Sequence, residues 1–122
     1  LFEMYRDVDA DRLFDNLVYF LKAIQPVCEK YDIRMAIHPD DPAWPVFGLA
    51  RIMTGKEQLL KLMKAVDAPF NGVTLCTGSL GSNPENDIPD IIICPCAQSA
   101  VQCAWGFPGS SPSVSGRQHG HV

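Results

Sequence analysis

The chain of 122 residues lacks long hydrophobic runs and any surplus of positive charge. No apolar stretch approaches the ~20 residues that a membrane-spanning helix needs, so we predict no membrane association. Lys and Arg number 10 against 14 Asp and Glu, and the formal net charge is −4. This balance provides no basic patch for binding nucleic acid. The start also lacks a basic segment followed by an apolar one, so we expect no secretory signal peptide.

Acidic residues are missing from the last quarter of the chain. All 14 lie at or before Asp90, and after Ile93 the only residue among Asp, Glu, Lys and Arg is Arg117. Ser, Gly, Pro and Cys dominate there, and apolar residues follow neither a helical nor a strand period. Such a segment cannot bury enough apolar surface to offset its ordering entropy. We therefore predict two parts: a globular part over 1–93, and a disordered or poorly packed tail over 94–122 that is out of frame or otherwise aberrant.

Cysteine is abundant in this chain, yet the number and positions of the cysteines do not favour disulfides. There are five cysteines, which is an odd number, and three of them crowd into the last third. An odd number without a secretion signal favours reduced thiols in a reducing compartment. We therefore expect a cytoplasmic protein.

Two short apolar runs, each ending in a side chain that can bind a metal, organise the globular part. The run over 33–37 ends at His38, the run over 73–75 ends at Cys76, and each breaks into a Pro- or Gly-rich turn. Strand alternation puts each candidate ligand on the small or polar face, opposite the bulky apolar face. A helix-length segment separates the runs, so we predict parallel neighbouring strands joined by a right-handed crossover. Functional sites of such folds form where the strands end.

The helices around these strands are predicted from period and capping residues. Apolar residues recur at helical spacing from Leu13 to Tyr31, with Asp9 as N-cap and Pro26 expected to kink or locally break the helix. A capping-box pattern starts a second helix at Thr54, and that helix should end before Pro69. Four of its residues line one side: Leu59, Leu60, Met63 and Val66. A short apolar element over 88–93 is predicted to begin a third helix.

The loop between the first strand and the second helix is unusually long, covering 39–53. Loops of this length in a compact domain are usually functional or disordered. Its aromatic residues Trp44 and Phe47 and its Asp40–Asp41 pair favour function. The two carboxylates are candidates for acid–base catalysis or ligation, but adjacent Asp residues before Pro more commonly cap turns.

His38 and Cys76 together form a candidate pair of metal ligands, although each alone is more often structural. A catalytic ion usually takes three or more protein groups, so at least one further ligand must come from elsewhere. The segment 77–81 could hold an anionic group on backbone N–H donors, or it is simply a turn that requires Gly. A rival zinc cluster in the tail has unsuitable spacing. Its candidate ligands are Cys94, Cys96, Cys103, His119 and His121.

Several segments closely resemble the D-mannonate dehydratase family. They are His38-Pro39-Asp40-Asp41-Pro42, Pro45-Val46-Phe47-Gly48-Leu49, the stretch from Asn71 through Cys76 to Gly81, and the helical Asn16-Leu17-Val18-Tyr19-Phe20-Leu21. The resemblance runs from about Tyr5 to Ile92 and does not extend into the tail.

The resemblance implies an α/β fold, a (β/α)₈ barrel of the xylose-isomerase-like kind, of which this chain would supply about two βα units. It implies dehydration of D-mannonate to 2-keto-3-deoxy-D-gluconate in hexuronate breakdown, with Fe²⁺ or Mn²⁺ as cofactor. It makes His38 and Cys76 metal ligands, and it leaves Asp40, Asp41 and Ser79 as weaker candidates for contacting the sugar acid.

The same resemblance sets limits on this chain. The remaining family ligands, a His and an Asp, and the proton-transfer groups would lie further downstream. A barrel of this kind has ~250 residues, so we expect this chain to be an internal fragment that is inactive alone. A homo-oligomer is one assembly that the resemblance allows for the full-length parent. The alternative is a non-enzymatic α/β fragment, or a small metal-binding module that uses the tail cysteines.

Overall fold

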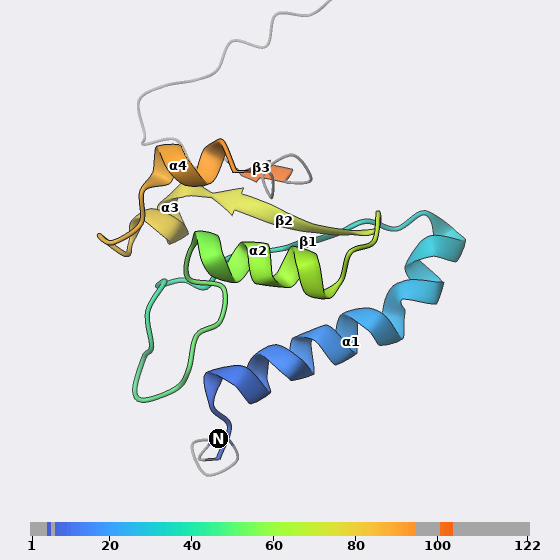
Figure 1. Cartoon of the computed structure of the whole chain (residues 1–122), viewed down its shortest axis with the longest axis horizontal. Helices are drawn as coiled ribbons and strands as arrows, with labels where there is room; N and C mark the ends of the chain where they lie inside the picture. The colour runs from blue at the N-terminus through green and yellow to red at the C-terminus, as the bar shows by residue number, and fades with distance from the viewer. Residues whose placement is uncertain (1–4, 6, 95–100, 104–122) are drawn as a thin grey trace, which may run out of the picture.

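The computed structural model describes residue 5, residues 7–94 and, as backbone, residues 101–103. The helices and strands follow one another in the order expected of βα units (Figure 1). They are α1 (Ala10–Tyr31), β1 (Met35–Ile37), α2 (Lys56–Ala65), β2 (Asn71–Cys76), α3 (Thr77–Gly81), α4 (Ile88–Ile92) and β3 (Val101–Cys103).

The three strands form one parallel sheet in the order β1-β2-β3. Ala36 is the register partner of Gly72, so the predicted parallel pairing of the first two strands is confirmed. The third strand lies in the segment for which we predicted no strand, and that part of the prediction was wrong. Three residues are too few to display a period of two, and β3 is specified by hydrogen bonding to β2 rather than by its own pattern.

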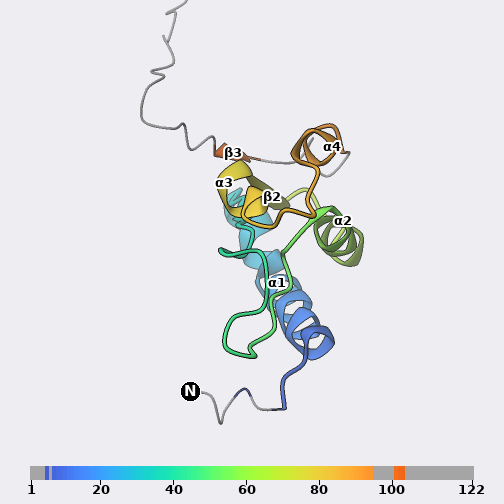
Figure 2. The same ribbon diagram turned by 90° about the vertical axis from the view of Figure 1, so that its left-hand side faces the viewer.

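Helices α2 and α4 lie on the same side of the sheet, as the turned view shows (Figure 2). The apolar side chains of β2 on its odd-numbered face, Val73 and Leu75, share one hydrophobic cluster with Leu59 and Leu62 of α2. The predicted apolar stripe of α2 omitted Leu62, which is fully buried. Every residue of β2 is buried, as is usual for the central strand of a parallel sheet.

Helix α1 begins and ends where the sequence indicated. The side chain of Asp9 accepts a hydrogen bond from the Arg12 backbone N–H at 2.8 Å, which caps the first turn. Asp32 ends the helix in the left-handed region with φ 51°. The helix continues through Pro26 without a break. Pro26 and Lys22, whose carbonyl loses its helical donor, are both exposed, so water can satisfy that carbonyl.

Two predicted local structures differ from the observed ones. Helix α2 has Gly55 as its N-cap, without a side-chain capping bond, so the capping box at Thr54 is wrong. The Thr54 carbonyl instead accepts a hydrogen bond from the Asn86 amide at 2.8 Å, which places Thr54 in the preceding loop. The segment 77–81, predicted as a turn, is the short helix α3.

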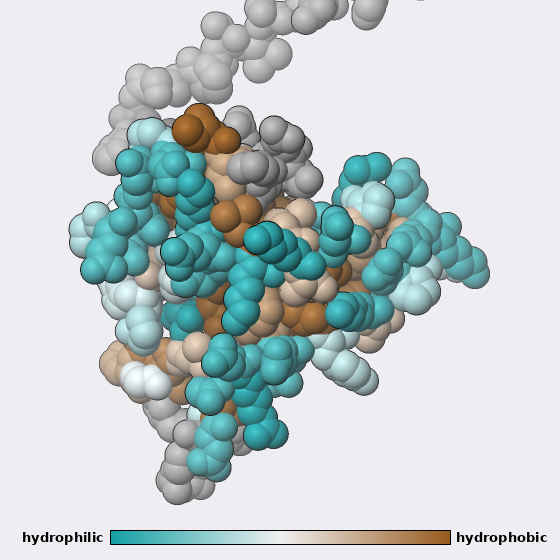
Figure 3. All heavy atoms as spheres, viewed as in Figure 1, coloured by the Kyte–Doolittle hydropathy of each residue, from teal (hydrophilic) through white to brown (hydrophobic). Residues whose placement is uncertain are grey.

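The molecular surface in the orientation of Figure 1 is mostly polar, with hydrophobic patches between polar side chains (Figure 3). One strongly hydrophobic patch lies over α4, at whose end Ile93 is 80% exposed. None of the helices in the described part of the chain has the length and hydropathy that a bilayer crossing demands.

Candidate metal site

His38 and Cys76 come together at the carboxyl edge of the sheet. His38 directly follows β1, and Cys76 is the last residue of β2. The pairing of Ala36 with Gly72 puts the even-numbered residues of both strands on one face, so the two candidate ligands share that face. Their side chains also lie close enough to interact, because His38 is among the groups that lower the pKa of the Cys76 thiol. The predicted placement of these two residues on neighbouring parallel strands therefore agrees with the fold, and their role as metal ligands stays a prediction.

The ring of His38 is oriented by the backbone that follows it. Its Nδ1 lies 2.7 Å from the carbonyl oxygen of Pro39. A carbonyl oxygen can only accept, so this bond requires a proton on Nδ1. In the neutral ring Nε2 then carries the lone pair that can bind a metal ion. His38 is exposed on this face. Metal-binding histidines commonly hold their second nitrogen in this way.

Cys76 is 5% exposed and has a lowered pKa. Burial alone raises the pKa of this thiol because it disfavours the charged form. Hydrogen bonds from the side chain and backbone of Ser79, together with the hydrogen bond and charge of His38, outweigh the burial and bring the pKa below its ordinary value. The site therefore favours thiolate, the form of cysteine that binds metals.

Ser79 connects Cys76 to one of the two predicted carboxylates. Its hydroxyl lies 3.3 Å from the Cys76 sulfur and 3.2 Å from Oδ2 of Asp41, and the residue is 2% exposed. A hydroxyl has one proton to donate, so the thiolate and the carboxylate compete for it. Ser79 and Asp41 are thus part of the same site as the His38–Cys76 pair, and Asp41 is exposed at its edge.

Asp40 has a different role from its neighbour. Its Oδ2 accepts hydrogen bonds from the backbone N–H groups of Ile52 at 2.8 Å and Met53 at 2.7 Å. Its Oδ1 pairs with Arg51 at 3.3 Å. These contacts close the long loop at its base. The turn-forming alternative therefore describes Asp40, whereas Asp41 remains available to a ligand.

Two residues that the sequence analysis missed attach the long loop to α3. The Ser82 hydroxyl accepts from the backbone N–H of Ala43 at 3.0 Å and donates to the Ser79 carbonyl at 2.6 Å. The Asn83 amide donates to the Ala43 carbonyl at 3.4 Å. These contacts join positions about forty residues apart, and no local spacing in the sequence signals them.

Among the side chains that the structure describes, no group of three or more His, Cys, Asp and Glu residues could hold a metal ion. The His38–Cys76 pair is therefore incomplete within this part of the chain. Of the rival tail ligands, Cys94 is buried and forms no disulfide with another described cysteine. Cys96, His119 and His121 lie outside the described residues, and Cys103 is described by its backbone alone.

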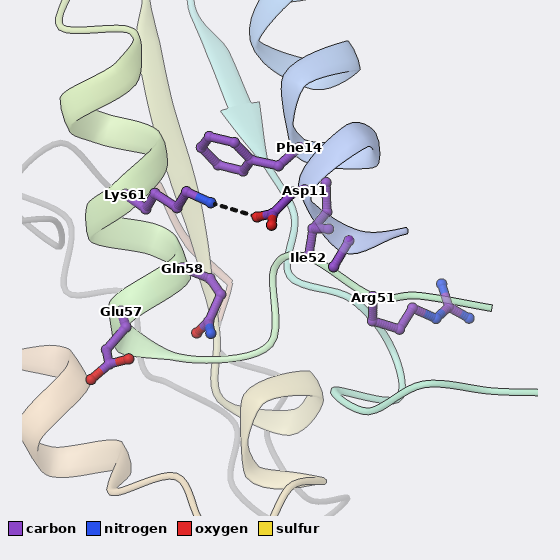
Figure 4. Close-up of a pocket in the computed structure, with 8 residues that line it drawn as sticks. Asp11, Phe14, Arg51, Ile52, Glu57, Gln58 and Lys61 are labelled. Atoms are coloured by element: carbon purple, nitrogen blue, oxygen red, sulfur yellow. Dashed lines mark hydrogen bonds and ion pairs between the residues drawn. The ribbon is translucent and has the colours of Figure 1, made fainter. Parts of the chain in front are cut away.

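A separate hollow of about 240 Å³ opens near the first turns of α1 and α2 (Figure 4). None of the predicted site residues lines it. The Lys61 ammonium reaches across to Asp11 at 3.4 Å and lies 4.2 Å from the centre of the Phe14 ring. This cation is therefore already partnered.

These features define a class of protein: parallel βα units with a metal-capable pair where neighbouring strands end. A family model described as D-mannonate dehydratase (UxuA) matches residues 1–96, and the chain belongs to this family of dehydratases, which are hydro-lyases. The match ends three residues after the composition change at Ile93 (96 − 93 = 3).

Curated relatives and a solved structure agree with the family. The chain is 67% identical over 92 residues to mannonate dehydratase of Brachyspira hyodysenteriae, covering 75% of this chain and 26% of that protein. It is 62% identical over 91 residues to mannonate dehydratase of Thermotoga neapolitana, covering 75% and 25%. The crystal structure of mannonate dehydratase from Streptococcus suis serotype 2 superposes with a TM-score of 0.68 at 44% identity, covering 70% of this chain and 24% of that one. The chain thus spans about a quarter of its relatives' length.

Proposed function

We propose that this chain is an internal piece of a mannonate dehydratase, a hydro-lyase that removes water from D-mannonate to give 2-keto-3-deoxy-D-gluconate in cytoplasmic hexuronate breakdown. The parent folds as a (β/α)₈ barrel, and this piece contributes about two βα units and half of the metal site. The observation that carries the proposal is the convergence of His38 and Cys76 at the carboxyl edge of the sheet, in a chain that belongs to this family.

The donor atoms of the pair fit a divalent transition metal. Nε2 of His38 is left free by the Pro39 contact, and the Cys76 pKa is lowered toward thiolate. The combination of an imidazole and a thiolate ligand suits Fe²⁺, because both are relatively soft ligands. The expectation of Mn²⁺ comes from the family resemblance alone. When bound, the ion supplies a Lewis acid for the negative charge that develops on the substrate carboxylate as the adjacent proton is removed.

The other residues of the site orient the ligands and present a polar edge to the sugar acid. The Pro39 carbonyl fixes the ring of His38, and Ser79 supports the charged form of Cys76. The exposed Asp41 carboxylate, held by the Ser79 hydroxyl, is placed to accept a hydrogen bond from a substrate hydroxyl. A catalytic ion needs a third protein ligand, and the proton-transfer groups lie downstream, so the chain alone should be inactive.

A fusion protein tests this function. Residues 1–93 of this chain should be joined to the corresponding downstream part of the Brachyspira hyodysenteriae relative, with which it shares 67% identity over the aligned segment. We expect this fusion to convert D-mannonate to the keto acid, measured by mass spectrometry, while the 122-residue chain produces none.

The same fusion carries the matched variants. His38→Ala and Cys76→Ser should each abolish turnover, because either loss leaves an incomplete ligand set. Lys61→Ala removes a charge from the hollow between α1 and α2 and should leave turnover unchanged. Activity in the 122-residue chain itself, or full activity in the His38→Ala fusion, would refute the proposal.

A further inference from the structure

The start of the long loop is held at a single residue, Ala43, by the two side chains that directly follow α3. The Ala43 N–H donates to the Ser82 hydroxyl at 3.0 Å, and the Ala43 carbonyl accepts from the Asn83 amide at 3.4 Å. Ala43 is 1% exposed, so its backbone groups need partners within the protein. Figure 1 shows the loop leaving β1 near α3 and extending beyond the sheet. We call these contacts of Ser82 and Asn83 with Ala43 the Ala43 latch.

Asp41 lies between the Ala43 latch and a second fixed point of the loop. The latch holds the backbone two residues after Asp41. One residue before Asp41, the Asp40 carboxylate is bonded to backbone N–H groups at the far end of the loop. The backbone is thus fixed on both sides of Asp41, whose exposed carboxylate lies 3.2 Å from the Ser79 hydroxyl. Ser82 is bonded to Ser79 as well, through the Ser79 carbonyl at 2.6 Å.

We propose that Ser82 is a positioning residue for the sugar acid. By holding Ala43, it keeps the Asp41 carboxylate against Ser79, where that carboxylate accepts a hydrogen bond from a substrate hydroxyl. Ser82 thereby sets the affinity for a polyhydroxy acid and acts on it through Asp41. The proposal rests on the proposed function for the identity of the substrate, and it assigns a role to a residue outside the candidate pair of metal ligands.

The Ser82 hydroxyl matters because a fixed carboxylate binds better than a mobile one, whose ordering opposes binding. Without this hydroxyl, the buried Ala43 N–H loses its acceptor, and the start of the loop should shift to expose it to water. The Asp41 carboxylate should then leave its place beside Ser79 for part of the time. The contact between Ser79 and the Cys76 sulfur joins residues three positions apart and does not involve the loop, so the metal-capable pair should keep its environment.

Amide hydrogen exchange of the 122-residue chain tests the latch without substrate or metal. The Ala43 amide should exchange about tenfold faster in Ser82→Ala than in the unmodified chain, because the acceptor of its hydrogen bond is gone. Ser82→Thr keeps a hydroxyl and should keep the protection. The Met53 amide, which donates to Asp40, is the internal control and should exchange alike in all three proteins. Equal Ala43 exchange in Ser82→Ala and the unmodified chain overturns the latch.

The fusion with the Brachyspira hyodysenteriae relative tests the role in substrate binding. Ser82→Ala should raise KM for D-mannonate about tenfold and change kcat by less than about threefold, because support for binding is lost while the metal ligands stay in place. Ser82→Thr should restore KM. Asp90→Asn is the matched control, because it breaks the 2.7 Å ion pair of Lys56 and Asp90 between α2 and α4, away from the loop. It should leave KM unchanged.

A double-variant cycle separates positioning from a general structural effect. If Ser82 acts through Asp41, Ser82→Ala should raise KM by less than about twofold in a fusion that already carries Asp41→Ala. Two KM increases that multiply would contradict the proposal. An unchanged KM in the Ser82→Ala fusion overturns it too and leaves the proposed function standing. A fusion that shows no turnover before any substitution overturns the proposed function and with it the role of Ser82 in binding, whereas the amide exchange still decides whether the latch exists.

Discussion

Asp40 and Asp41 are neighbours with identical side chains, and they have different roles because their contacts differ. Asp40 is bonded to the backbone of Ile52 and Met53, whereas Asp41 faces Ser79 at the metal-capable pair. Sequence analysis placed both at the right edge of the sheet. It could not separate them, because their partners lie eleven or more positions away.

Substituting Asp40→Asn should destabilise the chain by about 1–3 kcal/mol, the cost of disrupting several hydrogen bonds to a partly buried charged group. The amide keeps the shape but replaces an acceptor with a donor that faces backbone N–H groups or Arg51. Asp41→Asn is the matched control and should change the free energy of unfolding by less than about 0.5 kcal/mol. Urea unfolding of both variants is the measurement, and equal effects would argue against the loop-closing role of Asp40.

Ser79→Ala should raise the pKa of Cys76, since the serine hydroxyl is among the groups that lower it against the effect of burial. A lowered pKa in the folded state contributes stability that is present above the ordinary thiol pKa and is lost as pH falls through the lowered value. The stability difference between the original chain and Ser79→Ala should therefore shrink as the pH falls.

Thiolate absorbance against pH measures this pKa directly, taken as the difference between each protein and its Cys76→Ser counterpart. Ser82→Ala is the control, because Ser82 contacts the backbone of Ala43 and Ser79 but not the Cys76 sulfur. An unchanged titration in Ser79→Ala would show that the hydroxyl does not support the thiolate.

The elements that could be predicted from the sequence are those with local signals. Helix α1 has an N-cap and a long apolar period, and β1 and β2 end at the predicted residues or within one of them. The start of α2 was placed too early, because the capping-box pattern at Thr54 competes with the Asn86 contact that keeps Thr54 in the loop. Helix α3 and strand β3 are too short for a period to show.

Leu62→Ala should cost about 2–5 kcal/mol of stability, as for other fully buried leucines. Leu62 was missing from the predicted stripe, but it lies in the cluster that α2 shares with β2. Leu60→Ala makes the same truncation on the same helix at a partly buried position and should cost less. Thermal or urea unfolding gives both values, and a larger loss for Leu60→Ala would contradict the observed packing.

At the scale of the whole molecule, the chain is a quarter of a family member joined to a tail of different composition. The family match covers residues 1–96, and the aberrant origin of the tail stays a prediction. Reading the coding DNA past Ile93 in all three frames checks it. We expect family sequence to resume in another frame, and an intact frame running through this tail in genomic DNA would contradict the prediction.

The central claim is that His38 and Cys76 jointly hold a divalent ion, and metal content after anaerobic loading with Fe²⁺ and gel filtration tests it most directly. The unmodified chain, which supplies two of the ligands, should retain more of the metal than His38→Ala or Cys76→Ala, because a single remaining ligand of the pair binds more weakly than two. Cys94→Ala should retain it. Retention by both His38→Ala and Cys76→Ala, with loss only in Cys94→Ala, would contradict the account and assign the metal to the tail cysteines.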